Sequence, residues 1–186
     1  MAMTSRQRVR TALSHKEPDR VPVDFGATRS TGINALAYSA LRKHLGMAGD
    51  PVRVYDLKQL LALPDADMLA LFHSDCVQLH RMAPSAGLDI RAWKPERLMD
   101  GDLYLVPENY HPVRLGDGSD TIVDAAGQVQ LRRPAGGMYF DDVATPFADV
   151  GDEADLARMP YPSLSEAEAV YLRAESIRLS EASEAA

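Results

Sequence analysis

The stretch RVPVDFG, residues 20–26, decides the fold expected of this chain. It is short, rich in residues that favour strands, and closed by Gly26, so it predicts a strand. Pro22 agrees with that prediction because proline is tolerated near the start of a strand. The sequence does not fix the register of this strand.

Helices are predicted on both sides of this strand. Thr4 and Gln7 have the spacing of a capping box, so residues 5–15 read as a short amphipathic helix. A second helix is expected over residues 31–45, where a threonine can act as N-cap and the apolar residues fall on one stripe. Gly46 supplies its C-terminal stop.

The next segment predicts a helix and then a second strand. Residues 54–63 have a helical pattern that Pro64 interrupts, and Asp65 can cap another turn or two of helix. Residues 71–80 contain β-branched and alternating residues that are typical of a strand. Its first residue lies somewhere between 71 and 76, because the pattern does not define that boundary.

The chain is expected to have three parts: an N-terminal part at 1–86, a β-rich insertion at 87–150 and a helical segment at 151–186. In the insertion, short apolar runs are separated by turn signals such as Asp117-Gly118 and Gly136-Gly137, which predict hairpins. The last part predicts two helices, over 152–159 and 165–183. In the second of these, three apolar residues are expected to be buried, namely Val170, Ala174 and Ile177.

Composition excludes several classes of protein. The 186 residues are 46% hydrophobic and 25% charged, which is typical of a folded globular chain and not of a disordered one. The net charge of −7, without a Lys/Arg cluster, argues against a nucleic-acid partner. No apolar run has the length of a membrane span. The single cysteine cannot form an internal disulfide, so a reducing, cytoplasmic location is expected.

Two blocks resemble the uroporphyrinogen decarboxylase superfamily. The opening, SRQRVR at 5–10 followed by EPDRVPVDFG at 17–26, resembles its N-terminal signature, and LFHSDCVQL at 71–79 is similar to the family's strand with an essential aspartate. This resemblance implies an α/β fold, the N-terminal part of a TIM-like (β/α)8 barrel with a β-meander insertion. Such barrels need about 250 residues. The chain is therefore expected to pair with the missing barrel half or to form a homo-oligomer.

The resemblance implies one of two chemistries. The decarboxylases of the family hold a tetrapyrrole with an aspartate, a role that falls here to Asp75 as the catalytic residue. They also clamp substrate carboxylates with an arginine-rich segment, and here residues 24–32 contain only Arg29. This difference favours the other branch, the corrinoid-dependent methyltransferases. Decarboxylation of uroporphyrinogen remains the alternative reaction.

The resemblance also implies which cofactors belong to the complete enzyme. Members of the methyltransferase branch bind zinc through His and Cys ligands and act with a corrinoid partner protein. With one cysteine, this chain is expected to hold no metal or cofactor and to be inactive alone. Its expected ligand is a small molecule, a tetrapyrrole or a corrinoid. An alternative of another class is a non-catalytic fragment or interaction module that pairs with a second chain.

Three further residues are candidates for substrate binding. Asp24 and Arg29 flank Gly26 at the end of the first predicted strand, where a glycine lets a ligand approach the backbone. The alternative reading is a surface salt bridge beside a turn. For Asp75, the alternative is an ordinary loop or helix-capping aspartate.

Residues 73–80 also invite a metal-site reading, because they hold His73, Asp75, Cys76 and His80. Strand alternation argues against a single site. His73 and Asp75 are expected on one face of the strand, and Cys76 and His80 on the other.

Overall fold

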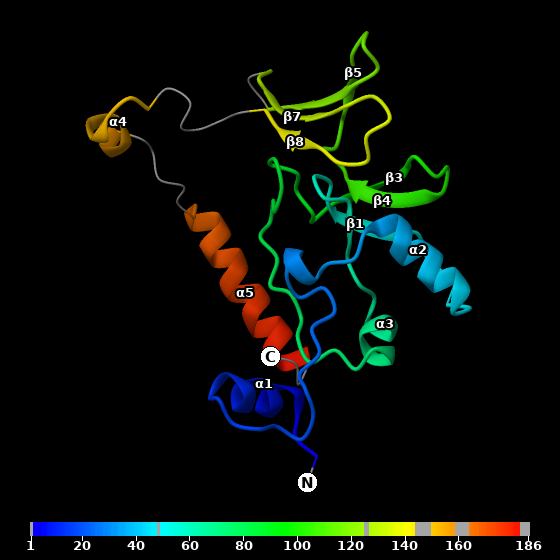
Figure 1. The fold of residues 1–186 in the computed structure, drawn as a ribbon, viewed down its shortest axis with the longest axis vertical. Coiled ribbons are helices and arrows are strands. Elements are labelled where there is room, and N and C mark those ends of the chain that lie inside the picture. The colour runs from blue at the N-terminus through cyan, green and yellow to red at the C-terminus, as the bar shows by residue number, and fades with distance from the viewer. Residues whose placement is uncertain (1, 48, 125–126, 144–149, 159–163, 183–186) are drawn as a thin grey trace.

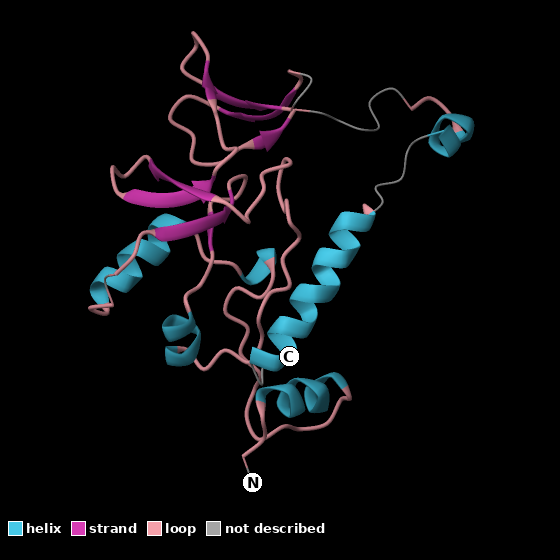
Figure 2. Cartoon of the chain, turned by 180° about the vertical axis from the view of Figure 1, so that it is seen from behind, coloured by secondary structure: helices cyan, strands magenta, loops and turns pink. Residues whose placement is uncertain are grey.

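The structure is a computed structural model that describes residues 2–47, 49–124, 127–143, 150–158 and 164–182. Two small sheets lie at one end of the molecule, and α1 (Ser5–Leu13) lies at the other end (Figure 1). Irregular extended segments and the long helix α5 (Glu166–Ala182) connect these two ends (Figures 1 and 2). The helix α4 (Glu153–Arg158) stands apart from this body in both views.

The N-terminal helix forms where the capping pattern predicts it. The Thr4 side chain accepts a hydrogen bond from the Gln7 backbone N–H, and the Gln7 side chain accepts one from the Thr4 N–H. This reciprocal pair satisfies two N–H groups that a helix end leaves without partners. The prediction of a helix beginning at residue 5 is confirmed.

The second helix, α2 (Ala35–His44), begins later than the sequence predicts. Its N-cap is Asn34, whose side chain accepts from the Leu36 N–H, whereas Thr31 belongs to a 3-10 turn, η1 (Arg29–Thr31). Gly46 follows the helix with φ +67°, the left-handed conformation in which glycine is favoured. The predicted stop is therefore confirmed.

The first sheet has the strand order β2-β1-β4-β3. Its strands are β1 (Val52–Asp56), β2 (Leu61–Ala62), β3 (Trp93–Arg97) and β4 (Leu103–Pro107). β1 is antiparallel to β2 and parallel to β4, and β3 is antiparallel to β4. Pro95 can lie in β3 because β3 is an edge strand. The sheet joins strands from both sides of residue 86, where the sequence predicts a boundary between parts.

The second sheet is an antiparallel meander with the order β5-β6-β7-β8. Its strands are β5 (Val113–Arg114), β6 (Asp120–Val123), β7 (Val129–Arg133) and β8 (Asp141–Asp142). The Asp117-Gly118 turn joins β5 to β6, with Gly118 at φ +80°. Hairpins in this part of the chain are thus present as predicted.

The core lies between α2 and the two sheets. Buried side chains from α2, the first sheet, α3 (Ala66–Leu71) and the second sheet form one cluster. Tyr38 of α2 is completely buried, and its hydroxyl donates to Asp65 Oδ2 at 2.8 Å. The described helices include none long and apolar enough to cross a membrane.

The predicted fold class is wrong. The chain is an α+β domain with one mixed and one antiparallel sheet, and the described residues do not form part of a (β/α)8 barrel. A barrel requires successive parallel strands, each followed by a helix. The strands predicted at 20–26 and 71–80 are absent, because residues 20–26 and 74–80 have no regular secondary structure and residues 72–73 are a turn at the end of α3, and the parallel pairing among the described residues joins β1 to β4.

The predicted helix at 54–63 is also wrong, because local side-chain bonds favour a tight turn. The Asp56 carboxylate accepts from the backbone N–H groups of Lys58 and Gln59 at 2.9 and 3.0 Å. Aspartate side chains compete with helical hydrogen bonds in this way. Leu60 then takes a left-handed conformation at φ +55°, and the chain returns as β2.

The apolar stripe of α5 faces away from the body of the molecule. Val170 is 63% exposed and Ile177 is 53% exposed, and Ala174 between them is also exposed. The side that the helix turns inward carries the half-buried Tyr171, Leu172 and Leu179 and the buried Glu168, which forms an ion pair with Arg81 at 2.6 Å. The prediction that this stripe is buried is wrong.

Candidate functional site

A cavity of about 300 Å³ lies where the two extended segments meet α5. Its wall comes from segments that are distant in the sequence. The residues that line it are Phe25, Gly26, Ala27, Leu63, Pro64, Leu69, Cys76, Val77, Gln78, His80, Ile90, Tyr171, Glu175, Arg178 and Leu179. The two sequence blocks that carry the family resemblance therefore contribute neighbouring parts of one wall.

One backbone hydrogen bond and two bonds from backbone N–H groups to side chains hold these two blocks together. The Asp75 N–H donates to the Val23 carbonyl at 2.7 Å, and the Val23 N–H donates to Asp75 Oδ2 at 2.8 Å. In addition, the Phe25 N–H donates to Ser74 Oγ at 3.3 Å. Residues 23–25 and 74–75 are thus fixed side by side without forming a regular ladder.

The Asp75 carboxylate is the centre of a buried ion-pair cluster. Arg8 Nη1 donates to it at 2.5 Å from α1, and Arg20 donates to both of its oxygens at 2.6 and 2.9 Å. Arg8 is itself buried and also forms an ion pair with Asp19 at 2.7 Å. These contacts tie α1 to the extended segments that form the cavity wall.

The pKa of Asp75 follows from these contacts. Burial alone would raise it, but hydrogen bonds from the Val23 N–H, Ser5, Arg20 and Arg8 outweigh burial and lower the pKa to about 2. The carboxylate therefore stays ionised, with both oxygens occupied by donors. Asp75 does not line the cavity, so the geometry gives it a structural task and its catalytic role stays a prediction.

This low pKa predicts that acid weakens the fold through Asp75. A carboxyl group whose pKa is lower in the folded than in the unfolded chain adds stability above its ordinary value of 3.8, and loses it as the pH falls toward about 2. We expect the difference in stability between the wild type and Asp75→Asn to shrink between pH 5 and about pH 2. Urea unfolding at a series of pH values measures it. A difference that stays constant over this range would contradict the assignment.

The three predicted substrate-binding residues end up in different places. Gly26 lines the cavity with φ +85°. Asp24 is exposed, and its Oδ1 accepts from the Ala27 N–H at 2.7 Å, which closes the turn around Gly26. Arg29 points elsewhere, because its Nε forms an ion pair with the buried Asp56 at 2.8 Å and its Nη2 donates to the Pro84 carbonyl. Of the three, the structure brings only Gly26 to the cavity.

Gln78 was not selected from the sequence, and His80 was considered there only as a possible metal ligand. Gln78 Oε1 and His80 Nδ1 are both buried and have no hydrogen-bond partner within the described ranges. The His80 ring lies edge-on to Tyr55, with 4.6 Å between ring centroids. Alternation along residues 76–80 was the available signal, since it places Cys76, Gln78 and His80 on the same face of an extended segment.

Burial keeps His80 and Cys76 neutral. It lowers the pKa of His80 to about 4, although the charge of Glu175 acts in the opposite direction. It also raises the pKa of the Cys76 thiol, and the nearby charges of Asp24 and Asp75 add to that rise. At neutral pH both side chains are uncharged.

The charged residues of the wall come from α5 and are paired. Arg178 donates to the Glu175 carboxylate through Nε at 2.8 Å and Nη2 at 2.5 Å. This bidentate pair neutralises both charges within one turn of helix. The cavity wall therefore combines apolar side chains with one closed ion pair and the neutral polar side chains of Cys76, Gln78, His80 and Tyr171.

The side chains do not form a zinc site. Cys76 and His80 line the cavity, but no group of three or more His, Cys, Asp or Glu residues in the described part of the chain could hold a metal ion. His73 does not line the cavity, and its backbone is left-handed at φ +51°. Zinc needs at least three protein ligands, and the third residue of suitable type in this wall, Glu175, is bonded to Arg178 instead.

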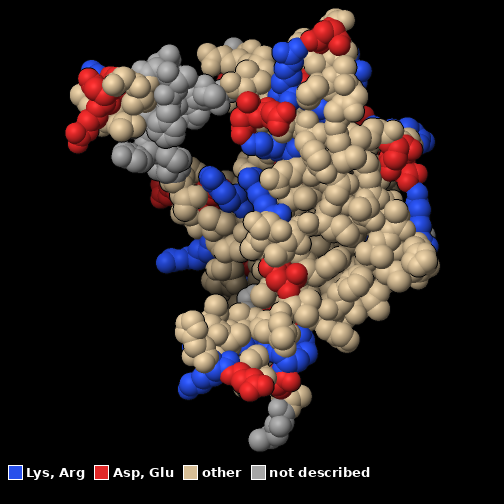
Figure 3. Space-filling view, in the orientation of Figure 1, with Lys and Arg blue, Asp and Glu red and all other residues tan. Residues whose placement is uncertain are grey.

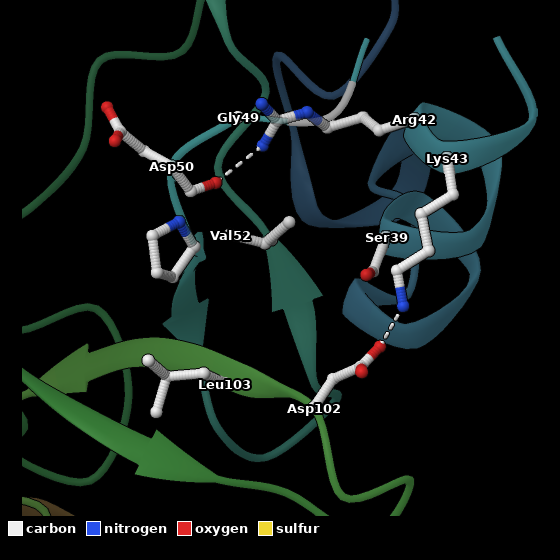
Figure 4. Close-up of a pocket in the computed structure, with 9 residues that line it drawn as sticks. Ser39, Arg42, Lys43, Gly49, Asp50, Val52, Asp102 and Leu103 are labelled. Carbon is white, nitrogen blue, oxygen red and sulfur yellow. Dashed lines mark hydrogen bonds and ion pairs between the residues drawn. The ribbon is translucent and has the colours of Figure 1, made fainter. Parts of the chain in front are cut away.

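Two other hollows contain charged side chains that are already bonded within the protein. One of about 230 Å³ lies between α2, β1 and β4, where Lys43 pairs with Asp102 and Arg42 Nη1 donates to the Asp50 carbonyl at 3.0 Å (Figure 4). In one of about 480 Å³ beside the second sheet, Arg114 and Arg133 both pair with Asp120. On the face in Figure 3, acidic and basic side chains likewise lie next to one another.

Comparison of the chain with protein-family models, curated proteins and solved structures finds no match.

Proposed function

We propose that this chain is the N-terminal portion of a uroporphyrinogen decarboxylase-like enzyme of the corrinoid-dependent methyltransferase type. The observation that supports the proposal is the convergence of its two characteristic blocks. Residues 23–25 and 74–75 bond to each other, and residues 25–27 and 76–80 line the same cavity. A family signature that builds a small-molecule site is expected to converge in this way.

The charges around the cavity favour methyl transfer over decarboxylation. A tetrapyrrole with several carboxylates needs free cationic groups to clamp it. Arg29 is engaged by Asp56, and Arg178 is engaged by Glu175. The volume of about 300 Å³ is also at the lower end for ligand pockets and fits one ring better than a macrocycle. Uroporphyrinogen is therefore the less favoured substrate.

The complete enzyme requires more than this chain. The exposed stripe of α5, with Val170 and Ile177, is an apolar surface that we propose a second polypeptide covers. Zinc and the corrinoid would come with that partner, because the wall described above does not hold a metal. One alternative is that the chain is a non-catalytic module. It is favoured because the Asp75 carboxylate is already bonded to Arg8 and Arg20. We propose a cytoplasmic location, in agreement with a single free cysteine.

The test is an assay for methyl transfer from methylcobalamin to a thiol, followed by the change in cobalamin absorbance. We expect no turnover by the chain alone and turnover by the complex isolated with its natural partner polypeptide. Conversion of uroporphyrinogen III to coproporphyrinogen by the same complex would instead support the decarboxylase. If neither reaction occurs in the complex, the chain is a binding module and the proposal is wrong.

A further inference from the structure

Three charged residues form a row across the second sheet. Arg114 of β5 lies directly opposite Asp120 of β6, which in turn lies directly opposite Arg133 of β7. Residues that oppose each other in this way have their side chains on one face of the sheet. Asp120 is buried, and both guanidinium groups bond to its carboxylate. One carboxylate balances only one of two positive charges, so the row carries an excess positive charge.

This row lines the hollow of about 480 Å³ beside the second sheet. The other lining residues come from the end of β3 and the turn after it, at 96–99, and from positions 110 and 112. Arg97 adds a third guanidinium group, whose Nη1 donates to the Gly101 carbonyl at 2.6 Å, and Glu96 adds a second carboxylate. With three arginines against two carboxylates, the lining is positively charged overall.

The hydroxyl group of Tyr110 faces this hollow without a protein partner. Tyr110 is 2% exposed, and its ring belongs to the core. The hydroxyl group bonds to no residue in the described ranges, yet it is not among the side-chain oxygens that are closed off from solvent. Buried polar groups in folded proteins nearly always have a partner. A group of this kind beside an open volume indicates that a ligand supplies the missing bond.

Electrostatics place the same hydroxyl group beside the charged lining. Burial raises the pKa of Tyr110 to about 12, and the positive charge of Arg133 opposes this rise. The negative charges of Asp120 and Glu96 add to it. All three of these charged residues line the hollow. At neutral pH the hydroxyl group is therefore protonated and can donate a hydrogen bond to a ligand there.

The available donors fit a carboxylate group. Nη1 of Arg114 and Nη1 of Arg133 donate to no residue in the described part of the chain. Guanidinium N–H groups and a tyrosine O–H bond well to carboxylate oxygens. The single excess charge compensates a monoanion. The second charge of a phosphate group would instead face Asp120 and Glu96 without a counter-charge.

The rest of the lining can hold an apolar ligand body. Leu98, Met99 and Pro112 line the same hollow, and Met99 is 47% exposed. Methionine sulfur makes favourable contacts with aromatic rings. The volume of about 480 Å³ lies within the range of small-molecule sites. A ligand with one charged group and one ring therefore matches both parts of the lining.

We infer that this hollow binds a small organic carboxylate, whose charged group bonds to Arg114, Arg133 and Tyr110. The inference goes beyond the proposed function and does not rest on it. None of these three residues lines the cavity of about 300 Å³ at α5. Binding here without methyl transfer by the complex, or methyl transfer without binding here, would each remove one claim and keep the other.

The experiment uses benzoate as the probe, with the whole chain labelled with ¹³C at its methionine methyl groups. We expect benzoate to shift the Met99 resonance, which Met99→Leu assigns, in a saturable way with a millimolar or lower dissociation constant. Benzyl alcohol, which is neutral, and inorganic phosphate should each bind about tenfold more weakly. Equal binding of benzoate and either control, or no shift of Met99, would overturn the inference.

Two variants test the hydroxyl group and the charge balance. Tyr110→Phe keeps the buried ring and removes an atom that has no protein partner, so it should fold normally and bind benzoate about tenfold more weakly. Glu96→Gln removes a negative charge from the lining and should tighten benzoate binding by about threefold. Tyr139→Phe is the matched control, because Tyr139 is 48% exposed and does not line the hollow. It should leave the affinity unchanged.

A third variant leaves the core untouched. The Arg114 side chain is 67% exposed, so Arg114→Gln should not impair folding, and it removes the excess charge of the row. We expect benzoate to bind about tenfold more weakly to this variant. If Tyr110→Phe and Arg114→Gln both bind benzoate as tightly as the wild type does, the carboxylate does not contact these residues and the inference is wrong.

Discussion

Replacing Asp75 by asparagine should lower the free energy of unfolding by about 3–5 kcal/mol, which is the range for removing one partner of a buried ion pair. The carboxylate is completely buried and bonds to Arg8, Arg20 and the Val23 N–H. Asparagine has nearly the same shape, but its neutral amide offers one acceptor and brings two donors toward the arginines. The buried Arg8 would keep only Asp19 as a counter-charge.

Asp24→Asn is the matched control for this substitution. Asp24 is exposed and uses one oxygen to accept from the Ala27 N–H, which the asparagine amide oxygen can also do. We expect its effect to be within about 0.5 kcal/mol, as for most surface substitutions. Urea unfolding of both variants at pH 7 measures the difference. Similar stabilities for the two variants would show that the Asp75 cluster does not hold α1 to the rest of the chain.

The sequence predicts those elements whose stabilising contacts are local. The capping box of α1 depends on residues three positions apart, and the left-handed Gly46 ends α2 in a way that its immediate neighbours determine. The turn at Asp117-Gly118 is equally local. Such features can be read from short windows because both partners of each contact lie inside the window.

Apart from the turn after Asp56, which local hydrogen bonds form, the errors occur where distant contacts decide the structure. Residues 52–56 form a central strand because they pair with β4, about fifty residues further along the chain. Glu168 of α5 faces inward because it forms an ion pair with Arg81. This orientation leaves the apolar stripe of α5 exposed. Strand preference depends on such packing more than on the residues themselves.

In the candidate site, too, features that depend on local contacts could be predicted and those that depend on distant contacts could not. Gly26 could be predicted because glycine after a strand-like stretch indicates a special backbone conformation. Gln78 and His80 could have been selected from alternation alone, but their lack of partners becomes visible only when α5 and residue 90 close the cavity. For Asp75, the partners Arg8 and Arg20 are 67 and 55 residues away, so no local pattern reveals the ion-pair cluster.

Gly26→Ala should also lower the free energy of unfolding, by about 2–4 kcal/mol. Two effects contribute. At φ +85° an alanine is strained, since L residues other than glycine rarely adopt left-handed conformations. In addition, a Cβ atom at this position would lie 2.8 Å from Cγ of Pro64, which is too close for two carbon atoms. Pro64 is a rigid ring in the cavity wall, so the wall must shift to relieve the contact.

Gly46→Ala separates the two effects. Gly46 has a similar conformation, with φ +67°, but a Cβ atom there would have no neighbour within 4 Å. Its substitution should cost only the backbone strain, roughly 1–2 kcal/mol. The excess loss in Gly26→Ala then reports the contact with Pro64, and Pro64→Ala in the same chain should recover most of that excess. If the two glycine variants lose equal stability, the backbone conformation alone explains Gly26. In that case the tight packing of residues 25–27 against Pro64 would not define the cavity wall.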